Sequence, residues 1–100
     1  MLEDHLEKLR SFYFTFEEGS ILHAAKKMRL SQPAITKAIK ILESEMKTTL
    51  FIRSRKGMTL TKDGDLLRVF CEKLFKNIRD LENSIGKNSE ISGVLSLIHI

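Results

Sequence analysis

The sequence has little cysteine and no long apolar run. Cys71 is the only cysteine among 100 residues, which excludes an internal disulfide and a thiol-rich metal site. No apolar run approaches the roughly 20 residues that a membrane-spanning helix needs. The amino terminus, MLEDHLEKLR, is charged and therefore unlike a signal peptide. These absences argue against a membrane protein and a disulfide-stapled secreted protein, and they favour the cytoplasm.

The groupings of side chains that catalysis or metal binding requires are also missing. There is no glycine-rich phosphate loop. Ser20 and Ser31 lack a matching histidine and aspartate, and helix capping explains them better. Cys71 lies on an apolar helix face and is better explained as a packed thiol than as a nucleophile. His5 and His99 have no partner at ligand spacing, so we expect no metal site. Together, these absences lead us to expect neither an enzyme nor a cofactor.

What the sequence does contain is a strongly basic middle. Residues 26–62 hold ten Lys and Arg against two Glu, a net charge of +8, whereas residues 1–25 and 63–100 carry −3 and −1. The whole chain, with a net charge of +4, is 42% apolar and 30% charged, which is typical of a globular domain. A block this basic indicates a polyanionic partner. Nucleic acid is the leading candidate, and an anionic membrane surface is the weaker one.

Hydrophobic periodicity predicts three helices in the first half of the chain. Residues 2–18 place apolar side chains at alternating steps of four and three, which is helical spacing. Ser20 is expected to cap a short second helix, and Ser31 a third helix with Pro33 in its first turn. The third helix divides into an apolar arc for the core and a polar arc that is free. The polar arc holds Gln32, Glu43, Thr36, Lys40, Pro33, Ser44 and Lys37.

After the third helix the sequence changes to the pattern of short β-strands. Phe51–Arg53 and Met58–Leu60 are expected to form two strands joined by the turn SRKG, in which Gly57 can adopt a positive φ. Thr61 is expected to cap a long final helix over residues 62–88. A heptad-like apolar seam on that helix predicts dimerisation. The seam, and so the predicted dimer interface, consists of Leu67, Cys71, Leu74, Ile78, Leu81 and Ile85.

This order of elements predicts a mainly α fold: a winged helix-turn-helix, with a three-helix core and a β-hairpin wing, followed by a long dimerisation helix. The major groove of B-DNA, about 12 Å wide, admits one helix, and the third helix has a free face. We expect Gln32 to bond an adenine edge, Pro33 and Thr36 to pack on a thymine methyl, and the wing to reach the minor groove. The candidate DNA-binding residues are Ser31, Gln32, Pro33, Thr36, Lys37, Lys40, Arg53, Arg55 and Lys56.

Simpler explanations compete for individual residues in this set. Helix-start chemistry alone accounts for Gln32 and Pro33 about as well as base contact does. Each lysine taken by itself is more often solvated than bound, and His23 is more often an exposed helix histidine than a ligand. It is the concentration of cations on the third helix and the wing that favours DNA.

Several motifs, in order and at matched spacing, resemble the amino-terminal DNA-binding domain of LysR-type transcriptional regulators. The match covers roughly residues 5–85. The resemblance implies DNA contact by Arg53 and its neighbours, in the minor groove or on its phosphates, and a homodimer through the 62–88 helix. The residues it places on the DNA bases are Gln32, Pro33, Thr36 and Lys37. The matching motifs are Gly19-Ser20, Ala24-Ala25, Ser31 to Ala34, Ile39 with Leu42-Glu43, Leu50-Phe51 with Arg53, and Leu60-Thr61 with Gly64.

Three residues depart from the usual pattern of that family. Lys47 stands where a helix-ending glycine is usual, and lysine tolerates a positive φ poorly, so we expect an altered or strained helix end. Thr36 replaces the usual serine. Lys37 stands where arginine is frequent, and because lysine lacks the planar guanidinium fork, the base preference at this contact is open.

We expect three segments along the chain: the winged helix-turn-helix over residues 1–61, the linker and dimerisation helix over 62–88, and a linker with a truncated continuation over 89–100. Members of the family continue into a larger effector-binding domain with a periplasmic-binding-protein-like fold, where an inducer binds and from which a higher oligomer can form. The final VLSLIHI is either the first strand of such a domain or a non-native tail. Because one frame of a widely used sequencing-transposon end encodes LSLIHI, we favour a non-native tail for residues 95–100.

The function that these observations favour is that of a sequence-specific transcriptional regulator of LysR type, represented by its DNA-binding portion, with double-stranded DNA as partner. Two alternatives stay open. A protein-interaction module, a helical dimer on a winged-helix scaffold, would scatter its cations, whereas DNA binding needs the third-helix lysines and the wing arginines on one side. Another one-component regulator, such as the molybdate-responsive type, would differ in the sequence beyond this chain.

Overall fold

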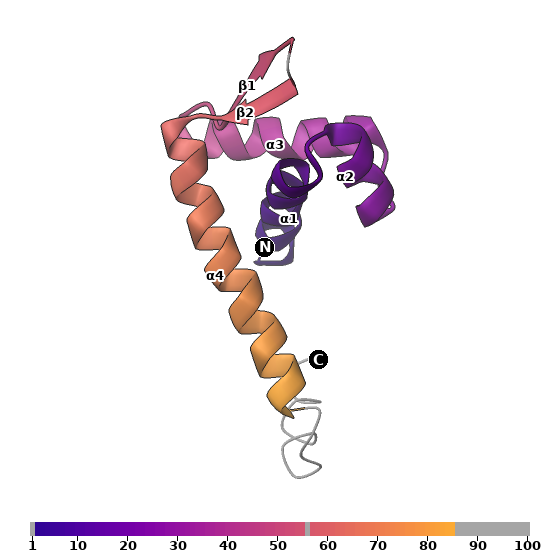
Figure 1. The fold of residues 1–100 in the computed structure, drawn as a ribbon, viewed down its shortest axis with the longest axis vertical. Helices are drawn as coiled ribbons and strands as arrows, with labels where there is room; N and C mark the ends of the chain where they lie inside the picture. Colours follow the sequence, from indigo (N-terminus) through magenta and orange to yellow (C-terminus); the bar gives the residue numbers. More distant parts are fainter. Residues whose placement is uncertain (1, 56, 86–100) are drawn as a thin grey trace.

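The structure, a computed structural model, describes residues 2–55 and 57–85 and contains the four helices and the hairpin expected from the sequence. Helix α3 lies across one end of the body, the hairpin rises beside it, and α4 extends away as a long arm (Figure 1). The mainly α, winged helix-turn-helix fold is thereby confirmed. The elements are α1 (Leu2–Glu18), α2 (Ile21–Met28), α3 (Gln32–Met46), β1 (Phe51–Ser54), β2 (Gly57–Leu60) and α4 (Lys62–Ile85).

Hydroxyl side chains cap the amino-terminal ends of three helices, as the sequence predicts. Ser20 Oγ accepts a hydrogen bond from the His23 N–H at 3.1 Å, and Ser31 Oγ accepts one from the Ala34 N–H at 3.2 Å. Thr61 Oγ1 accepts one at 2.9 Å from the first turn of α4. Each bond satisfies a backbone donor that the first turn would otherwise leave unpaired. The starting points of α2, α3 and α4 are therefore fixed by the local sequence.

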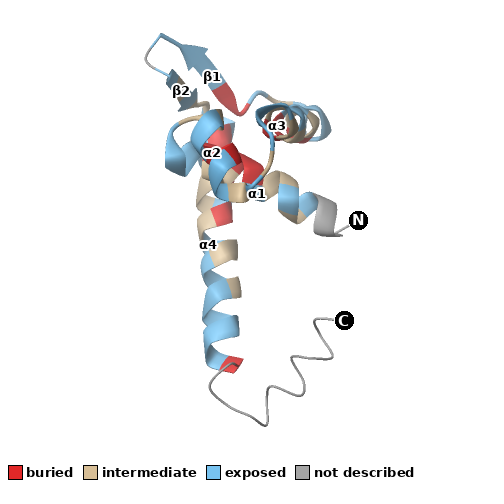
Figure 2. Ribbon diagram, turned by 90° about the vertical axis from the view of Figure 1, so that its right-hand side faces the viewer, coloured by how far each residue is buried: buried red, intermediate tan, exposed pale blue. Residues whose placement is uncertain are grey.

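The core gathers where α1, α3 and the base of the hairpin meet (Figure 2). Phe12, Ile35 and Leu50 come from these three places and are fully buried. The ring centroids of Phe12 and Phe51 lie 5.2 Å apart, so β1 packs directly on α1. The hairpin, which we call the wing, is therefore anchored at its base, while its tip projects from the body (Figure 1).

The first half of α4 belongs to this same core, so two residues of the predicted dimer seam pack within the chain itself. Leu67 is 8% exposed and Cys71 is fully buried, and both lie in the cluster that contains Phe12. Both side chains are therefore packed against the chain's own core. A heptad-like seam predicts that a helix buries one face, but it does not predict what that face is buried against. Burial also raises the pKa of the Cys71 thiol to about 11. Farther along the seam, Leu74 and Ile78 are half-buried, Leu81 is exposed and Ile85 is buried.

The boundaries of the wing and of α4 differ slightly from those expected. Each strand is one residue longer than predicted, because Ser54 pairs with Gly57 across the turn. Gly57 has a φ of +112°, as its expected role in the turn requires. Helix α4 is described as far as Ile85. The last residues of the expected 62–88 helix and the expected tail over 89–100 lie outside the described residues.

Within the described residues, two helices end on a residue other than glycine in the left-handed region. Arg29 has a φ of 57° and Lys47 a φ of 55°. The backbone N–H of Lys47 points to the carbonyls of Glu43 and Ser44, so this conformation closes the end of α3. The strained helix end expected at Lys47 is therefore confirmed, since a side chain in this region costs roughly 1–2 kcal/mol.

We predict that Lys47→Gly raises the free energy of unfolding by about 0.5–1 kcal/mol. Glycine removes the steric cost of the left-handed conformation, and its greater freedom in the unfolded chain offsets part of the gain. Urea unfolding followed by circular dichroism measures the change. Lys47→Ala is the matched control, because it shortens the side chain but keeps the Cβ. An equal gain in both variants would show that the lysine side chain, and not the backbone, is the source of the strain.

Candidate nucleic-acid interface

The polar arc of α3 is turned away from the core, as the sequence predicts. Four of the predicted DNA-binding residues on it are exposed, and the fifth, Thr36, is half-buried. On the other side of the helix, Ile35, Ile39 and Leu42 are buried and hold α3 to the core. Such a helix is rigidly seated and bare outward, which is what insertion into a groove requires. The four exposed residues are Gln32, Pro33, Lys37 and Lys40.

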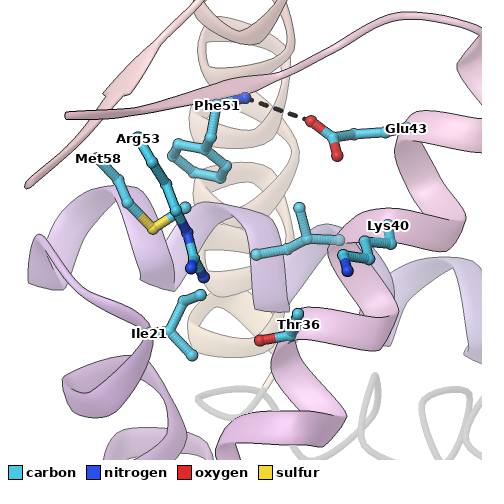
Figure 3. A pocket seen from close by; sticks show the side chains of 8 residues that line it. Ile21, Thr36, Lys40, Glu43, Phe51, Arg53 and Met58 are labelled. Carbon is cyan, nitrogen blue, oxygen red and sulfur yellow. Dashed lines mark hydrogen bonds between the residues drawn. The ribbon is translucent and has the colours of Figure 1, made fainter.

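A cleft of about 240 Å³ separates this face of α3 from the wing (Figure 3). Thr36, Lys40 and Glu43 line its α3 side, and they follow one another at helical spacing. The Arg53 side chain descends from β1 into the cleft, and its guanidinium points toward Ile21 and Thr36 (Figure 3). The structure thus brings a cation of the wing to the same face as the polar residues of α3.

The remaining predicted residues lie around this face. Ser31 is exposed, but its side-chain oxygen caps α3 and is occupied by the Ala34 N–H. Arg55 is exposed in the turn of the wing, beyond the last residue of β1. Lys56 lies outside the described residues. Of the wing cations within the described residues, Arg53 is therefore the one that lines the cleft beside α3.

Among the residues that the structure describes, the cations at this face form no ion pair, whereas several cations elsewhere are paired with acids. In the described part of the chain, no ion pair joins Lys37, Lys40, Arg53 or Arg55 to a carboxylate. Away from the face, Lys8 Nζ lies 2.7 Å from Glu45, and Arg68 bonds to Asp65 at 2.9 Å and to Glu72 at 2.7 Å. The hydrogen bond from Lys8 lowers the pKa of the Glu45 carboxyl. Unpaired cations on one face leave a positive potential that a phosphate backbone can neutralise.

The sequence does not predict how Glu43 is used. It lies on the polar arc as expected, but its carboxylate is turned to the backbone of the wing: Oε2 accepts a hydrogen bond from the Leu50 N–H at 2.6 Å. Two signals were available: Glu43 is the only acidic residue of that arc, and Leu42-Glu43 is one of the motifs that resemble the LysR family. An acid on a face otherwise suited to phosphate needs a separate structural reason.

Features that would indicate another class of function are not found in the described residues. Within residues 2–55 and 57–85, no three His, Cys, Asp or Glu side chains are grouped so that they could hold a metal ion. None of the helices in that same part of the chain is both long enough and apolar enough to cross a membrane.

Sequence comparison places this chain beside known regulators. The family model described as "Bacterial regulatory helix-turn-helix protein, lysR family" matches residues 6–65. The HTH-type transcriptional regulator CzcR of Bacillus cereus is 35% identical over 92 residues, which are 92% of this chain and 32% of CzcR. The HTH-type transcriptional regulator GltR of Bacillus subtilis (strain 168) is 34% identical over 93 residues, 93% of this chain and 31% of GltR. The chain therefore spans about a third of the length of these relatives.

Structural comparison gives the same result. The BenM_DBD/catB site 1 DNA complex matches with a TM-score of 0.76 and 28% identity, over 82% of this chain and 92% of that one. The CbnR_DBD–DNA complex matches with a TM-score of 0.69 and 28% identity, over 81% and 94% of the two chains. Both similar structures are crystal structures of complexes with DNA.

Proposed function

Because this chain belongs to the LysR family and carries its helix-turn-helix DNA-binding domain, we propose that it recognises a specific duplex sequence with α3 in the major groove and Arg53 at the neighbouring backbone or minor groove. The observation that carries this proposal is the single cleft that Thr36, Lys40 and Arg53 share. Scattered cations, which a protein-interaction module would show, do not produce such a face. The DNA is bound and not chemically altered.

The proposal assigns separate tasks to the two elements. On α3, the Gln32 amide and the carbon atoms of Pro33 and Thr36 would discriminate bases, while lysine and arginine side chains would neutralise phosphates. The relatives are transcriptional regulators about three times as long as this chain, so we propose that the chain is the DNA-reading part of such a regulator. An inducer would then bind outside the residues described. Since bacterial DNA lies in the cytoplasm, we propose that the protein acts there.

We also propose that two copies associate through a face of α4 that the core leaves free. Leu66 is 65% exposed, Phe70 55% and Leu81 52%. At about 100° per residue, Phe70 and Leu81 lie at nearly the same angle on the helix, and Leu66 lies close by. Pairing this face with a second copy would bury large apolar side chains that are otherwise in water. A two-fold dimer would present two α3 helices to a roughly palindromic site.

Gln32→Ala is expected to weaken binding to the preferred duplex by about 1–3 kcal/mol and to relax the base preference at one position. Alanine cannot form the paired hydrogen bonds that an amide makes with an adenine edge. The preferred duplex is first enriched by the unvaried chain from a random library, and fluorescence anisotropy then measures binding to it and to the unselected library. Equal losses on both kinds of DNA would contradict base recognition by Gln32.

Arg53→Ala is expected to weaken binding to both kinds of DNA and to flatten the salt dependence. Each phosphate that a protein neutralises contributes about 0.9 to the slope of log K against log salt on B-DNA. The slope is measured by repeating the anisotropy titrations over a series of salt concentrations. Arg10→Ala is the control, because Arg10 is exposed on α1 in a groove beside α4, away from the cleft. An unchanged slope in Arg53→Ala would rule out its phosphate contact.

A further inference from the structure

Glu43 joins the recognition helix to the wing. Its Oε2 atom accepts a hydrogen bond from the Leu50 N–H at 2.6 Å and a longer one from the Phe51 N–H at 3.4 Å. Figure 3 shows the carboxylate directed from α3 at the backbone where β1 begins. One side-chain oxygen therefore bridges the two elements that flank the cleft.

The position of this bridge determines what it can control. The Phe51 ring is packed on Phe12 in the core, and the same residue's N–H is held by Glu43. Arg53 follows two residues later, on a sheet that in the described part of the chain consists of β1 and β2 alone. A two-stranded hairpin is marginally stable by itself, so its angle to α3 depends on such contacts at its base. A wing that tilts away from α3 would carry Arg53 out of the cleft.

The negative charge of Glu43 and its hydrogen bonds should affect DNA binding in opposite directions. It lies one turn beyond Lys40 on the side of α3 that lines the cleft. A carboxylate at this place repels the phosphates of an approaching duplex, so removing its charge alone should strengthen DNA binding. Loss of its hydrogen bonds should act in the opposite direction if they hold the wing. The two contributions therefore have opposite signs and can be separated.

We infer that Glu43 is a positioning residue for DNA binding: through its hydrogen bonds to the start of β1 it holds the wing at the angle that keeps Arg53 over Thr36 and Lys40. This inference rests on the proposed function, since it assumes that the cleft faces DNA. Glu43 does not touch the DNA, and its effect passes through Arg53.

Two variants separate the effect of the length of the Glu43 side chain from the effect of its charge. Glu43→Gln keeps an oxygen at the same distance, and because both bonds go to a single carboxylate oxygen, the amide oxygen can accept both. Glu43→Asp keeps the charge but is one methylene too short for a 2.6 Å bond to the Leu50 N–H. Each is made in the 100-residue chain and also in the Arg53→Ala background. Binding is measured by anisotropy on the duplex enriched by the unvaried chain, at a temperature where circular dichroism shows every variant folded.

The inference predicts that Glu43→Gln binds as tightly as the unvaried chain or more tightly, and that Glu43→Asp binds about fivefold more weakly or worse. In the Arg53→Ala background the loss caused by Glu43→Asp should largely disappear, because residues that act through one another are not additive. A change in stability alone would not produce this dependence on Arg53.

Three results would overturn the inference. Glu43→Asp could bind like the unvaried chain, Glu43→Gln could lose as much as Glu43→Asp, or the loss could be the same with and without Arg53. If instead the unvaried chain enriches no sequence from the library, the proposed function fails and the role of Glu43 fails with it. An unvaried chain that binds selectively, together with any of the three results, removes the Glu43 assignment alone.

Discussion

Gly64→Ala should lower the free energy of unfolding by up to about 2 kcal/mol, although alanine is the better helix former. A Cβ at this position would overlap the Leu50 carbonyl oxygen and would lie 3.1 Å from a methyl carbon of Leu60. The nearest atom is backbone and cannot swing aside. Alanine in place of glycine inside a helix gains about 1 kcal/mol, but forcing atoms into a packed site costs about 1–3 kcal/mol and occasionally more.

The clash has a specific consequence for the fold, because Leu50 also accepts a hydrogen bond from the Thr61 N–H at 3.0 Å. Moving α4 away to make room would break this link between the wing and the helix. Urea unfolding measures the effect, with Lys76→Ala as the control at an exposed position of the same helix. A Gly64→Ala variant as stable as the unvaried chain would show that α4 does not approach β1 this closely.

Leu66→Gln combined with Phe70→Gln should convert a dimer into monomers and weaken binding to a duplex with two half-sites by about a hundredfold or more. Linked binding modules gain roughly 10²–10⁴ in apparent affinity from effective concentration. Glutamine keeps the helix propensity and removes the apolar surface of two side chains that are 65% and 55% exposed. Sedimentation equilibrium gives the mass, and anisotropy gives the affinities.

The half-site duplex is the internal control for this prediction. Binding to a single half-site should be nearly unchanged, because neither side chain lines the cleft or the second hollow on α3, which Gln32, Pro33 and Lys37 help to line. Lys76→Gln, on the same helix, should leave the mass unchanged. A double variant that remains dimeric at the same concentration would place the contact between copies elsewhere, with Leu81 as the next residue to test.

Local chemistry explains why so much of the fold was predictable from the sequence. Ser20, Ser31 and Thr61 each satisfy a backbone donor only a few residues away, so the starts of three helices follow from short stretches of sequence. The period of apolar residues along α3 separates its two faces, and the structure buries Ile35 and exposes Lys37 accordingly. The exposed part of the candidate site was predictable for the same reason.

The parts that escaped prediction depend on contacts between residues far apart in the sequence. Leu67 and Cys71 lie on a regular seam whether that seam meets a second copy or the chain's own core, and only the packing around Phe12 decides which. Glu43 looks like any exposed acid until Leu50, seven residues later, is placed beside it. Periodicity gives the direction of a side chain on its own helix, but not what it meets.

The rate at which Cys71 is alkylated can report how often α4 separates from the rest of the domain. Its thiol is fully buried, and with a pKa of about 11 it is almost entirely protonated at neutral pH, so alkylating reagents, which attack the thiolate, find almost nothing to react with. Alkylation of Cys71 therefore requires a local opening in which α4 separates from the core and exposes the thiol to solvent. Because the chain has no other cysteine, the rate at which a single mass increment appears would measure the rate of that opening in the unvaried chain, with no dye or added thiol.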